Sequence, residues 1–332
     1  MTSAQRARRA CSSTRRAVVA LALLLATAGC ERRAGSAAPP APSPSVVRIG
    51  YQKSSVLVLV KWRGTLEAPL AARHVKVEWA EFPAGPALVE ALNAAQLDLG
   101  YVGEAPPIFG QAASSSLIYV AVDQPSPRSE AIVVPKGSAI HSVADLKGKS
   151  VALNKGSNVH YFLVRALEKA GLDYSYVRPV FLPPSDARAA FENGTVDAWA
   201  IWDPYLASVE VAHAPRVLTT AEGIVDNNSL YIARRELAAE RPELLRTIFE
   251  HVRATDAWAR EHREEAARYL GPLLGIDDRA IQLSVSRASW NVGPITDSTV
   301  NGQQRIADAF LELGLIPEPL KVIDAAPKHQ VF

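Results

Sequence analysis

The feature that most constrains the fold of this chain is a repeated alternation of short apolar runs with amphipathic segments of helical period. The strand-like runs fall in two series, 47–51, 75–79, 97–102 and 118–122, then 150–153, 180–182 and 196–201. Strands that alternate with helices form βα units, so each series predicts an α/β lobe with a mainly parallel sheet. After a further run at 229–233 the chain turns helical, with helices expected over 242–262, 264–274 and 299–313.

The order of the two series predicts how the lobes are connected. The folded part begins near Val46, and we assign 46–128 and 228–332 to lobe 1 and 129–227 to lobe 2. The chain then crosses between the lobes twice, near residues 125–132 and 225–232. Open α/β sheets bind ligands beyond the carboxyl ends of their strands, where helix N-termini present unpaired N–H groups. The strand ends are therefore the places to look for a site.

The first 29 residues have the order of an export signal. Five arginines precede the apolar run 17–26, and the segment before that run contains no acidic residue. The run is too short to span a bilayer. Small residues follow, and then Cys30, a pattern similar to a bacterial lipobox, in which the cysteine receives a diacylglyceryl group. We therefore predict a signal peptide over 1–29 and lipidation at Cys30, with several acyl chains giving a stable anchor.

The segment that follows predicts a tether, and the composition excludes several classes of protein. Residues 30–45 are rich in Arg, Ala, Gly, Ser and Pro, which suits a solvated link from membrane to domain. Cys11 lies in the part that would be removed, so no disulfide framework or cysteine-based metal site is expected. The chain has 36 Lys+Arg and 34 Asp+Glu, but five arginines precede Gly29 and leave with the signal. Without a basic surplus, nucleic-acid binding is not expected.

One strand end has the features of an anion pocket. The run 150–153 leads through Gly156 into a helix whose first turn carries Ser157 and Asn158. Backbone amides at a helix N-terminus, together with two short polar side chains, make a compact site for an anion. From these residues alone, ordinary capping of the helix by Ser157 or Asn158 is the alternative.

Two other predicted strands, like the first, lead directly into a helix. In both, proline begins the helix. Gly103 and Glu104 precede two prolines, and a purely structural turn is the alternative there. Trp202 and Asp203 precede Pro204, and strand alternation leaves Trp202 at the tip of its strand, able to face a cleft, whereas Trp199 is assigned to the core.

Six stretches resemble the aliphatic sulfonate-binding proteins of bacterial ABC importers. They occur in the family's order, at 48–53, 81–86, 106–109, 143–148, 186–191 and 197–204, and the last reads Asp-Ala-Trp-Ala-Ile-Trp-Asp-Pro. The resemblance implies a two-lobed periplasmic binding protein fold of type II, with mixed, mainly parallel sheets, helices on both faces and a hinge of two crossings. It also implies a periplasmic monomer that captures an alkanesulfonate between the lobes and delivers it to an ABC transporter permease.

The chemistry of a sulfonate fits the residues at these strand ends. A sulfonate is fully ionised, offers three acceptors and no proton, and needs only neutral donors. The headgroup donors that we expect are the side chains of Gln52, Ser157 and Asn158 and the backbone amides of Gly103, Glu104, Gly156 and Ser157. The walls for the alkyl part that we expect are Phe82, Trp202 and Tyr231. Asp203 could receive an ammonium or hydroxyl group of the ligand tail, or cap the helix at Pro204.

The sequence does not favour catalysis. His160 lies in the first turn of the anion-binding helix, but no carboxylate within helical reach orients it, and no nucleophile motif is present. The other histidines lack metal-ligand spacing. We predict no catalytic residue, no metal and no cofactor. Two alternatives stay open: the same fold with taurine, nitrate or a pyrimidine precursor as ligand, and an enzyme similar to a thiamin pyrimidine synthase, whose Cys-rich iron-binding motif is missing here.

Overall fold

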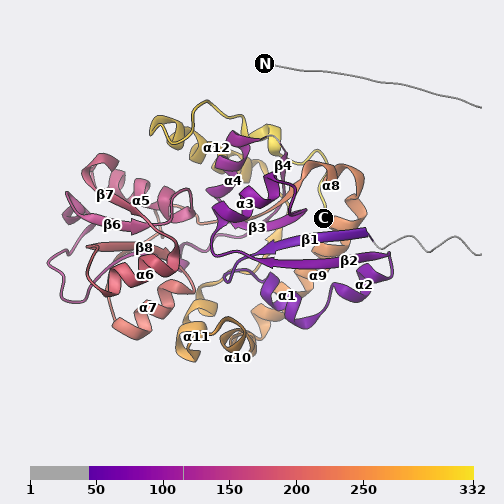
Figure 1. Cartoon of the computed structure of the whole chain (residues 1–332), viewed down its shortest axis with the longest axis horizontal. Helices are drawn as coiled ribbons and strands as arrows, with labels where there is room; N and C mark the ends of the chain where they lie inside the picture. The colour runs from indigo at the N-terminus through magenta and orange to yellow at the C-terminus, as the bar shows by residue number, and fades with distance from the viewer. Residues whose placement is uncertain (1–44, 115) are drawn as a thin grey trace, which may run out of the picture. The chain divides into compact units, whose positions relative to one another are not determined.

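The computed structural model describes residues 45–114 and 116–332 (Figure 1). The predicted signal peptide, Cys30 and nearly all of the tether lie outside the described residues. The first strand begins at Ser45, one residue before the predicted start of the folded part. Among the described helices, none combines the length and the hydrophobicity that crossing a bilayer requires.

Six strands form a mixed sheet, called sheet A here. Its order is β11 (Val292–Gly293), β4 (Leu117–Asp123), β10 (Ser229–Arg234), β3 (Leu99–Gly103), β1 (Ser45–Tyr51) and β2 (Val75–Glu81). Strand β1 pairs in parallel with β2 and with β3, as the βα pattern predicts. Strand β10 returns from far along the chain and lies antiparallel between β3 and β4.

Helices cover both faces of sheet A (Figure 1). One face packs against α1 (Leu57–Arg63), α2 (Glu67–Ala71), α8 (Arg235–Glu240), α9 (Pro242–Glu261), α10 (Arg263–Leu274) and α11 (Asp278–Arg287). The other packs against α3 (Gly85–Asn93), α4 (Pro106–Ala113) and α12 (Asp297–Glu312). Strand alternation separates the two cores, since Tyr231 belongs to the first and its neighbour Ile232 to the second. The helices after residue 240 therefore pack on sheet A.

Five strands form a second mixed sheet, called sheet B here. Its order is β7 (Arg178–Phe181), β6 (Ser150–Leu153), β8 (Ala198–Trp202), β5 (Glu130–Val134) and β9 (Arg216–Thr220). Strands β7, β6 and β8 are parallel, whereas β5 is antiparallel to both of its neighbours. Helix α5 (Asn158–Lys169) covers one face, and α6 (Pro184–Glu192) and α7 (Tyr205–His213) cover the other. We call sheet A with its helices lobe 1, and sheet B with its helices lobe 2.

The chain passes between the two sheets twice. It leaves β4 and reaches β5 through residues 124–129, which include the 3₁₀ turn η1 (Pro127–Ser129), and it returns from β9 to β10 through residues 221–228. The remaining 3₁₀ turns are η2 (Val143–Leu146), η3 (Tyr174–Tyr176) and η4 (Val322–Ala325). Both passages overlap the predicted hinge crossings. The expectation of two mixed α/β sheets with helices on both faces is confirmed, and the lobe boundaries at 128 and 228 stay predictions.

Candidate functional site

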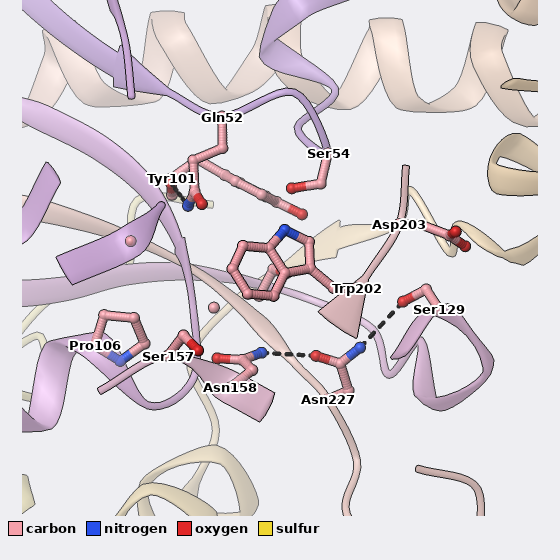
Figure 2. Close-up of a pocket in the computed structure, with 13 residues that line it drawn as sticks. Gln52, Ser54, Tyr101, Pro106, Ser129, Ser157, Asn158, Trp202, Asp203 and Asn227 are labelled. Carbon is pink, nitrogen blue, oxygen red and sulfur yellow. Dashed lines mark hydrogen bonds between the residues drawn. The ribbon is translucent and has the colours of Figure 1, made fainter. Parts of the chain in front are cut away.

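The strand ends of both lobes border one pocket, called the central pocket here, with about 470 Å³ of empty space (Figure 2). Elements of lobe 1, elements of lobe 2 and both crossings contribute to it. Its lining residues are Gln52, Ser54, Gly85, Tyr101, Gly103, Pro106, Ser129, Ser157, Asn158, Trp202, Asp203, Asn227 and Ser229. The structure thus brings together six of the ten predicted binding residues, and none of the lining side chains is a lysine or an arginine.

The N-terminus of α5 supplies the lobe 2 side of the central pocket. Ser157 is the N-cap residue, but its hydroxyl donates to the carbonyl of Asn154 at 2.7 Å instead of capping the first turn. The N–H groups of Gly156 and Ser157 also have partners within the protein. The N–H groups of Asn158 and Val159 make no hydrogen bond within the described residues. Unpaired amides and the positive end of the helix dipole therefore lie beside the pocket.

Asn158 joins this helix to lobe 1 and to the second crossing. Its Oδ1 accepts from the N–H of Ala105 at 3.1 Å, and its Nδ2 donates to Oδ1 of Asn227 at 2.6 Å. Asn227 in turn donates to the hydroxyl of Ser129 at 3.0 Å, so the chain of hydrogen bonds reaches the first crossing (Figure 2). A Cβ on Gly103 would lie 2.1 Å from Oδ1 of Asn158, so only glycine permits this approach.

Gln52 and Trp202 face each other across the central pocket. Gln52 is 6% exposed, and its Nε2 donates to the carbonyl of Tyr101 at 3.2 Å. Figure 2 shows the indole of Trp202 between Gln52 and Ser54 on one side and Asn158 on the other. The predicted position of Trp202, at the tip of its strand and facing a cleft, agrees with this arrangement.

Asp203 caps a helix and also forms an ion pair between the lobes. Its Oδ1 accepts from the N–H of Ala207 at 2.9 Å in the first turn of α7, which is the predicted capping alternative. Both carboxylate oxygens lie 3.4 Å from Nη1 of Arg287 in α11, and Nη2 of Arg287 lies 2.7 Å from Glu210. Burial raises the pKa of Asp203 to about 7, and Arg287 lowers it in part. An arginine of lobe 1 is thus paired with two acids of lobe 2, Asp203 just before α7 and Glu210 within it.

The side chain of Glu104 turns toward the second crossing. Its carboxylate accepts from both the backbone N–H and Nδ2 of Asn228, at 3.0 and 3.1 Å, and Gln303 donates to its backbone carbonyl. Burial raises the pKa of Glu104 to about 7, although the hydrogen bonds from Asn228 lower it in part. Glu104 does not line the central pocket in this structure.

Three further predicted residues lie elsewhere. Phe82 packs against the core of α3, α4 and α12. Tyr231 is fully buried, because β10 turns it toward α9, where Phe249 makes an edge-to-face contact at 5.1 Å. Gly156 has a φ of +75°, and its N–H donates to Nδ1 of His160. The wall roles expected for Phe82 and Tyr231, and the donor role expected for the Gly156 amide, therefore have no support in this pocket.

His160 is part of the core. Its side chain is fully buried, with Nδ1 facing the Gly156 N–H at 3.2 Å and Nε2 facing the hydroxyl of Tyr174 at 2.8 Å. Burial lowers its pKa to about 4, with a smaller effect of Lys155. The ring is therefore neutral and stabilises the turn before α5. Within the described residues, no group of His, Cys, Asp and Glu side chains is arranged to hold a metal ion.

Sequence reasoning missed the polar residues of the two crossings. Ser129, Asn227 and Ser229 line the central pocket, together with Ser54 and Tyr101 from lobe 1. The two predicted crossings could have pointed to these residues, because the segments that join two lobes also border a pocket between them.

The comparisons with known proteins agree with this architecture. The family model described as NMT1/THI5 like matches residues 89–266, more than half of the chain. A protein of Escherichia coli (strain K12) named as an aliphatic sulfonates-binding protein is 40% identical over 282 residues, which cover 84% of this chain and 88% of that protein. The chain therefore belongs to the NMT1/THI5-like family. Within it, the chain falls among the aliphatic sulfonate-binding proteins.

Two solved structures share the whole described fold. The alkanesulfonate-binding protein SsuA from Xanthomonas axonopodis pv. citri, bound to MOPS, has a TM-score of 0.82 at 36% identity and covers 86% of this chain and 99% of its own. The periplasmic aliphatic sulphonate binding protein SsuA from Escherichia coli has a TM-score of 0.78 at 39% identity and covers 85% of this chain and 92% of its own. The predicted two-lobed binding-protein fold is thereby confirmed.

Proposed function

We propose that this protein is a periplasmic solute-binding protein that captures an aliphatic sulfonate in the central pocket and delivers it to an ABC transporter permease. The observation that carries the proposal is a pocket at the N-terminus of α5, bordered by neutral polar groups of both lobes and by no lysine or arginine. The homologues named above, which bind sulfonates, support the same ligand class.

The donor set suits a permanently ionised monoanion. The unpaired amides at the start of α5 favour negative charge, and Gln52, Ser157 and Asn158 add neutral polar groups beside them. Sulfonate oxygens accept hydrogen bonds and carry no proton, so the pocket needs no base. Asp203 at the rim disfavours a dianion such as a phosphate ester. This arrangement selects one negative charge by hydrogen bonds.

Binding of the ligand by both lobes changes the form of the protein that a permease can recognise. A ligand that contacts Gln52 in lobe 1 and Ser157 in lobe 2 stabilises only the arrangement in which both are in reach. The contacts of Asn158 with Ala105 and of Arg287 with Asp203 already join the lobes. A permease that recognises the joined form thereby senses occupancy.

We infer that the protein binds its ligand without converting it. His160, the one histidine near the pocket helix, is buried with a contact at each ring nitrogen, so it has no free nitrogen to transfer a proton to a ligand. Asp203 is engaged by Ala207 and Arg287. The enzyme alternative therefore lacks an available base in the central pocket.

Export and anchoring complete the proposal. Residues 1–29 direct export, and Cys30 receives the lipid that holds the protein at the membrane. Cys30→Ser should release the protein into the soluble periplasmic fraction or leave the signal uncleaved, as fractionation and mass spectrometry would detect. Cys11→Ser is the matched control, because that cysteine lies within the removed segment. A fully processed Cys30→Ser protein that stays with the membrane would contradict the anchor.

The ligand class is tested by isothermal titration calorimetry on the purified mature domain. Butanesulfonate and ethanesulfonate should bind, whereas pentanoate and nitrate should bind at least tenfold more weakly. Taurine and a hydroxymethylpyrimidine serve as the probes for the alternative ligands. Binding of nitrate or the pyrimidine in preference to every sulfonate would overturn the proposed ligand class.

A further inference from the structure

A second cavity continues from the central pocket into lobe 1. It has about 620 Å³ of empty space and shares Ser54, Tyr101, Ser129, Asp203, Asn227 and Ser229 with the central pocket. Beyond these shared residues it extends to Asp123 at the end of β4 and to side chains of α10, α11 and the segment after α11. We call this extension the Asp123 pocket. Six residues border both cavities, which places the Asp123 pocket next to the central pocket.

Asp123 is a buried acid whose oxygens lack a hydrogen bond of normal geometry. The residue is 2% exposed, and neither carboxylate oxygen meets that geometry with a partner among the described residues. The Tyr101 hydroxyl and the Asn291 N–H lie near enough to lower its pKa in part. Buried carboxylates are normally paired, because an ionised oxygen without a donor is costly to desolvate. The indole N–H of Trp290, which also lines this pocket, likewise has no partner. The pocket thus presents polar atoms whose hydrogen-bonding capacity the protein itself leaves unused.

The cations near the Asp123 pocket are engaged elsewhere. Lys53, which itself lines the Asp123 pocket, donates to the carbonyl of Leu274 at 3.1 Å, and Arg260 donates to the carbonyl of Trp290. Arg287 is paired with Asp203 and Glu210. Among the described residues, no lysine or arginine lies within ion-pair distance of Asp123.

The surroundings of Asp123 add negative charge. Burial raises its pKa well above the usual range, and the nearby Asp256 raises it further, while Tyr101 and Arg260 lower it in part. Asp256 accepts from the N–H of Val292 and has its other oxygen without a partner. A cation entering the cavity would favour the ionised form of Asp123, which lines the cavity, and of Asp256 near it.

The rest of the lining suits a short alkyl chain that ends in a hydrogen-bond donor. Leu270, Ile281 and Val285 provide an apolar wall, and Ser55, Ser126, Ser284 and Ser289 provide hydroxyl groups around the acidic end. Methylene groups would pack on the first set, and an ammonium group would donate to Asp123 and to serine oxygens. A plain alkyl tail would instead seal Asp123 from water without a partner, which is unfavourable.

We propose that the Asp123 pocket is a tail site for a protonated amine, so that the ligand class of this protein is an aminoalkanesulfonate with its sulfonate in the central pocket. This inference rests on the proposed function, because the sulfonate end must occupy the central pocket. It adds a second recognition element, in lobe 1, which selects among sulfonates by the charge of their tails.

The test compares two ligands that differ only at the tail. In 3-aminopropanesulfonate an ammonium group replaces the terminal methyl group of butanesulfonate, so the two have the same length. By calorimetry at pH 7, the wild-type protein should bind the amino ligand at least tenfold more tightly. Equal affinities, or tighter binding of butanesulfonate, would overturn the tail site and leave the proposed function intact. Failure of both ligands to bind would overturn the proposed function itself.

The variant Asp123→Asn then assigns the preference to this residue. The amide keeps the shape of the side chain and removes its charge, so the variant should lose the preference for the amino ligand while binding butanesulfonate as tightly as before or more tightly. Asp186→Asn, at an exposed position on α6, is the matched control and should retain the preference. An equal loss for both ligands would show that Asp123 only supports the fold and would overturn the assignment. The wild-type comparison remains decisive if Asp123→Asn fails to fold.

Discussion

The two ends of the binding cavity differ in how far their polar groups are hydrogen-bonded within the protein. At the end nearest α5, the side-chain amide of Asn158 is hydrogen-bonded on both sides, to Ala105 and to Asn227, and no lysine or arginine lines the central pocket. At the other end, Asp123 is more deeply buried than Asn158, and its carboxylate oxygens lack a hydrogen bond of normal geometry among the described residues. Polar groups that are hydrogen-bonded within the protein hold a fixed geometry before the ligand binds. A buried polar group without such a bond can form one with a group of the ligand.

This difference teaches how the cavity divides recognition. The α5 end fixes the orientation of an anion with neutral groups that the protein holds rigidly. The Asp123 end favours the ligand that brings the missing counter-charge. Changes at the first end should therefore affect all sulfonates alike, whereas changes at the second should affect only ligands with a charged tail.

The largest effect is expected from Asn158→Asp. The carboxylate would lose the donor to Asn227 and would place a negative charge beside the sulfonate, so affinity for every sulfonate should fall by about 100-fold or more. Calorimetry with butanesulfonate and 3-aminopropanesulfonate measures the loss. Asn301→Asp is the control, because Asn301 is exposed on α12. Retained affinity for either ligand in Asn158→Asp would remove Asn158 from the headgroup site.

A smaller effect is expected from Gly103→Ala. The added Cβ would meet the side-chain amide of Asn158 at about 2.1 Å, so Asn158 must leave its position against Ala105. Affinity should fall by about tenfold, and unfolding should become easier by about 1–3 kcal/mol, as for other overpacked sites. Gly137→Ala adds the same atom where nothing lies within 4 Å, and it should change neither quantity. Identical behaviour of the two variants would show that the close approach of Gly103 and Asn158 is not needed.

The smallest effect is expected from pH. Burial raises the pKa of both Asp203 and Glu104 to about 7, with Arg287 opposing this at Asp203 and Asn228 opposing it at Glu104. An anion in the pocket favours the protonated forms, so the affinity for butanesulfonate should fall a few-fold as the pH rises from 6 to 8.

Other acids lie near these two. Glu210 pairs with Arg287, and the buried Glu130 interacts with Glu104. Asp123, whose pKa is also raised, would act in the same direction under a plain alkyl tail. Asp203→Asn should flatten part of the pH profile. An affinity that rises with pH would contradict the placement of the anion near these acids.

Residues typical of helix ends predicted part of the secondary structure. The helix whose first turn was expected to carry Ser157 and Asn158 is α5, Asn158–Lys169, and Gly171 follows it with a φ of +72°. Strand β5 follows the first crossing directly and was not separated from it, and β9, which is at the edge of its sheet, lacks a clear apolar alternation.

The sequence predicted the pocket residues that lie at the end of a single strand. It missed those that reach the pocket only because distant segments of the chain come together. Each of four predicted residues lies at the end of a strand or the start of a helix and lines the central pocket: Gln52, Ser157, Asn158 and Trp202. Asn227 acquires its role only through a hydrogen bond to a residue 69 positions away. Tyr231 was expected as a wall, but it points to the face of sheet A on which α9 packs, and no local pattern contains that information.

The central claim is that one ligand lies with its sulfonate at α5 and its amine at Asp123, and a crystal structure of the complex with 3-aminopropanesulfonate tests it most directly. We expect the sulfonate oxygens within hydrogen-bond distance of Asn158 and the first-turn amides of α5, and the ligand nitrogen within the same distance of a carboxylate oxygen of Asp123. A sulfonate bound outside the central pocket would contradict the proposed function. A sulfonate bound there, with the amine turned away from Asp123, would contradict the tail site.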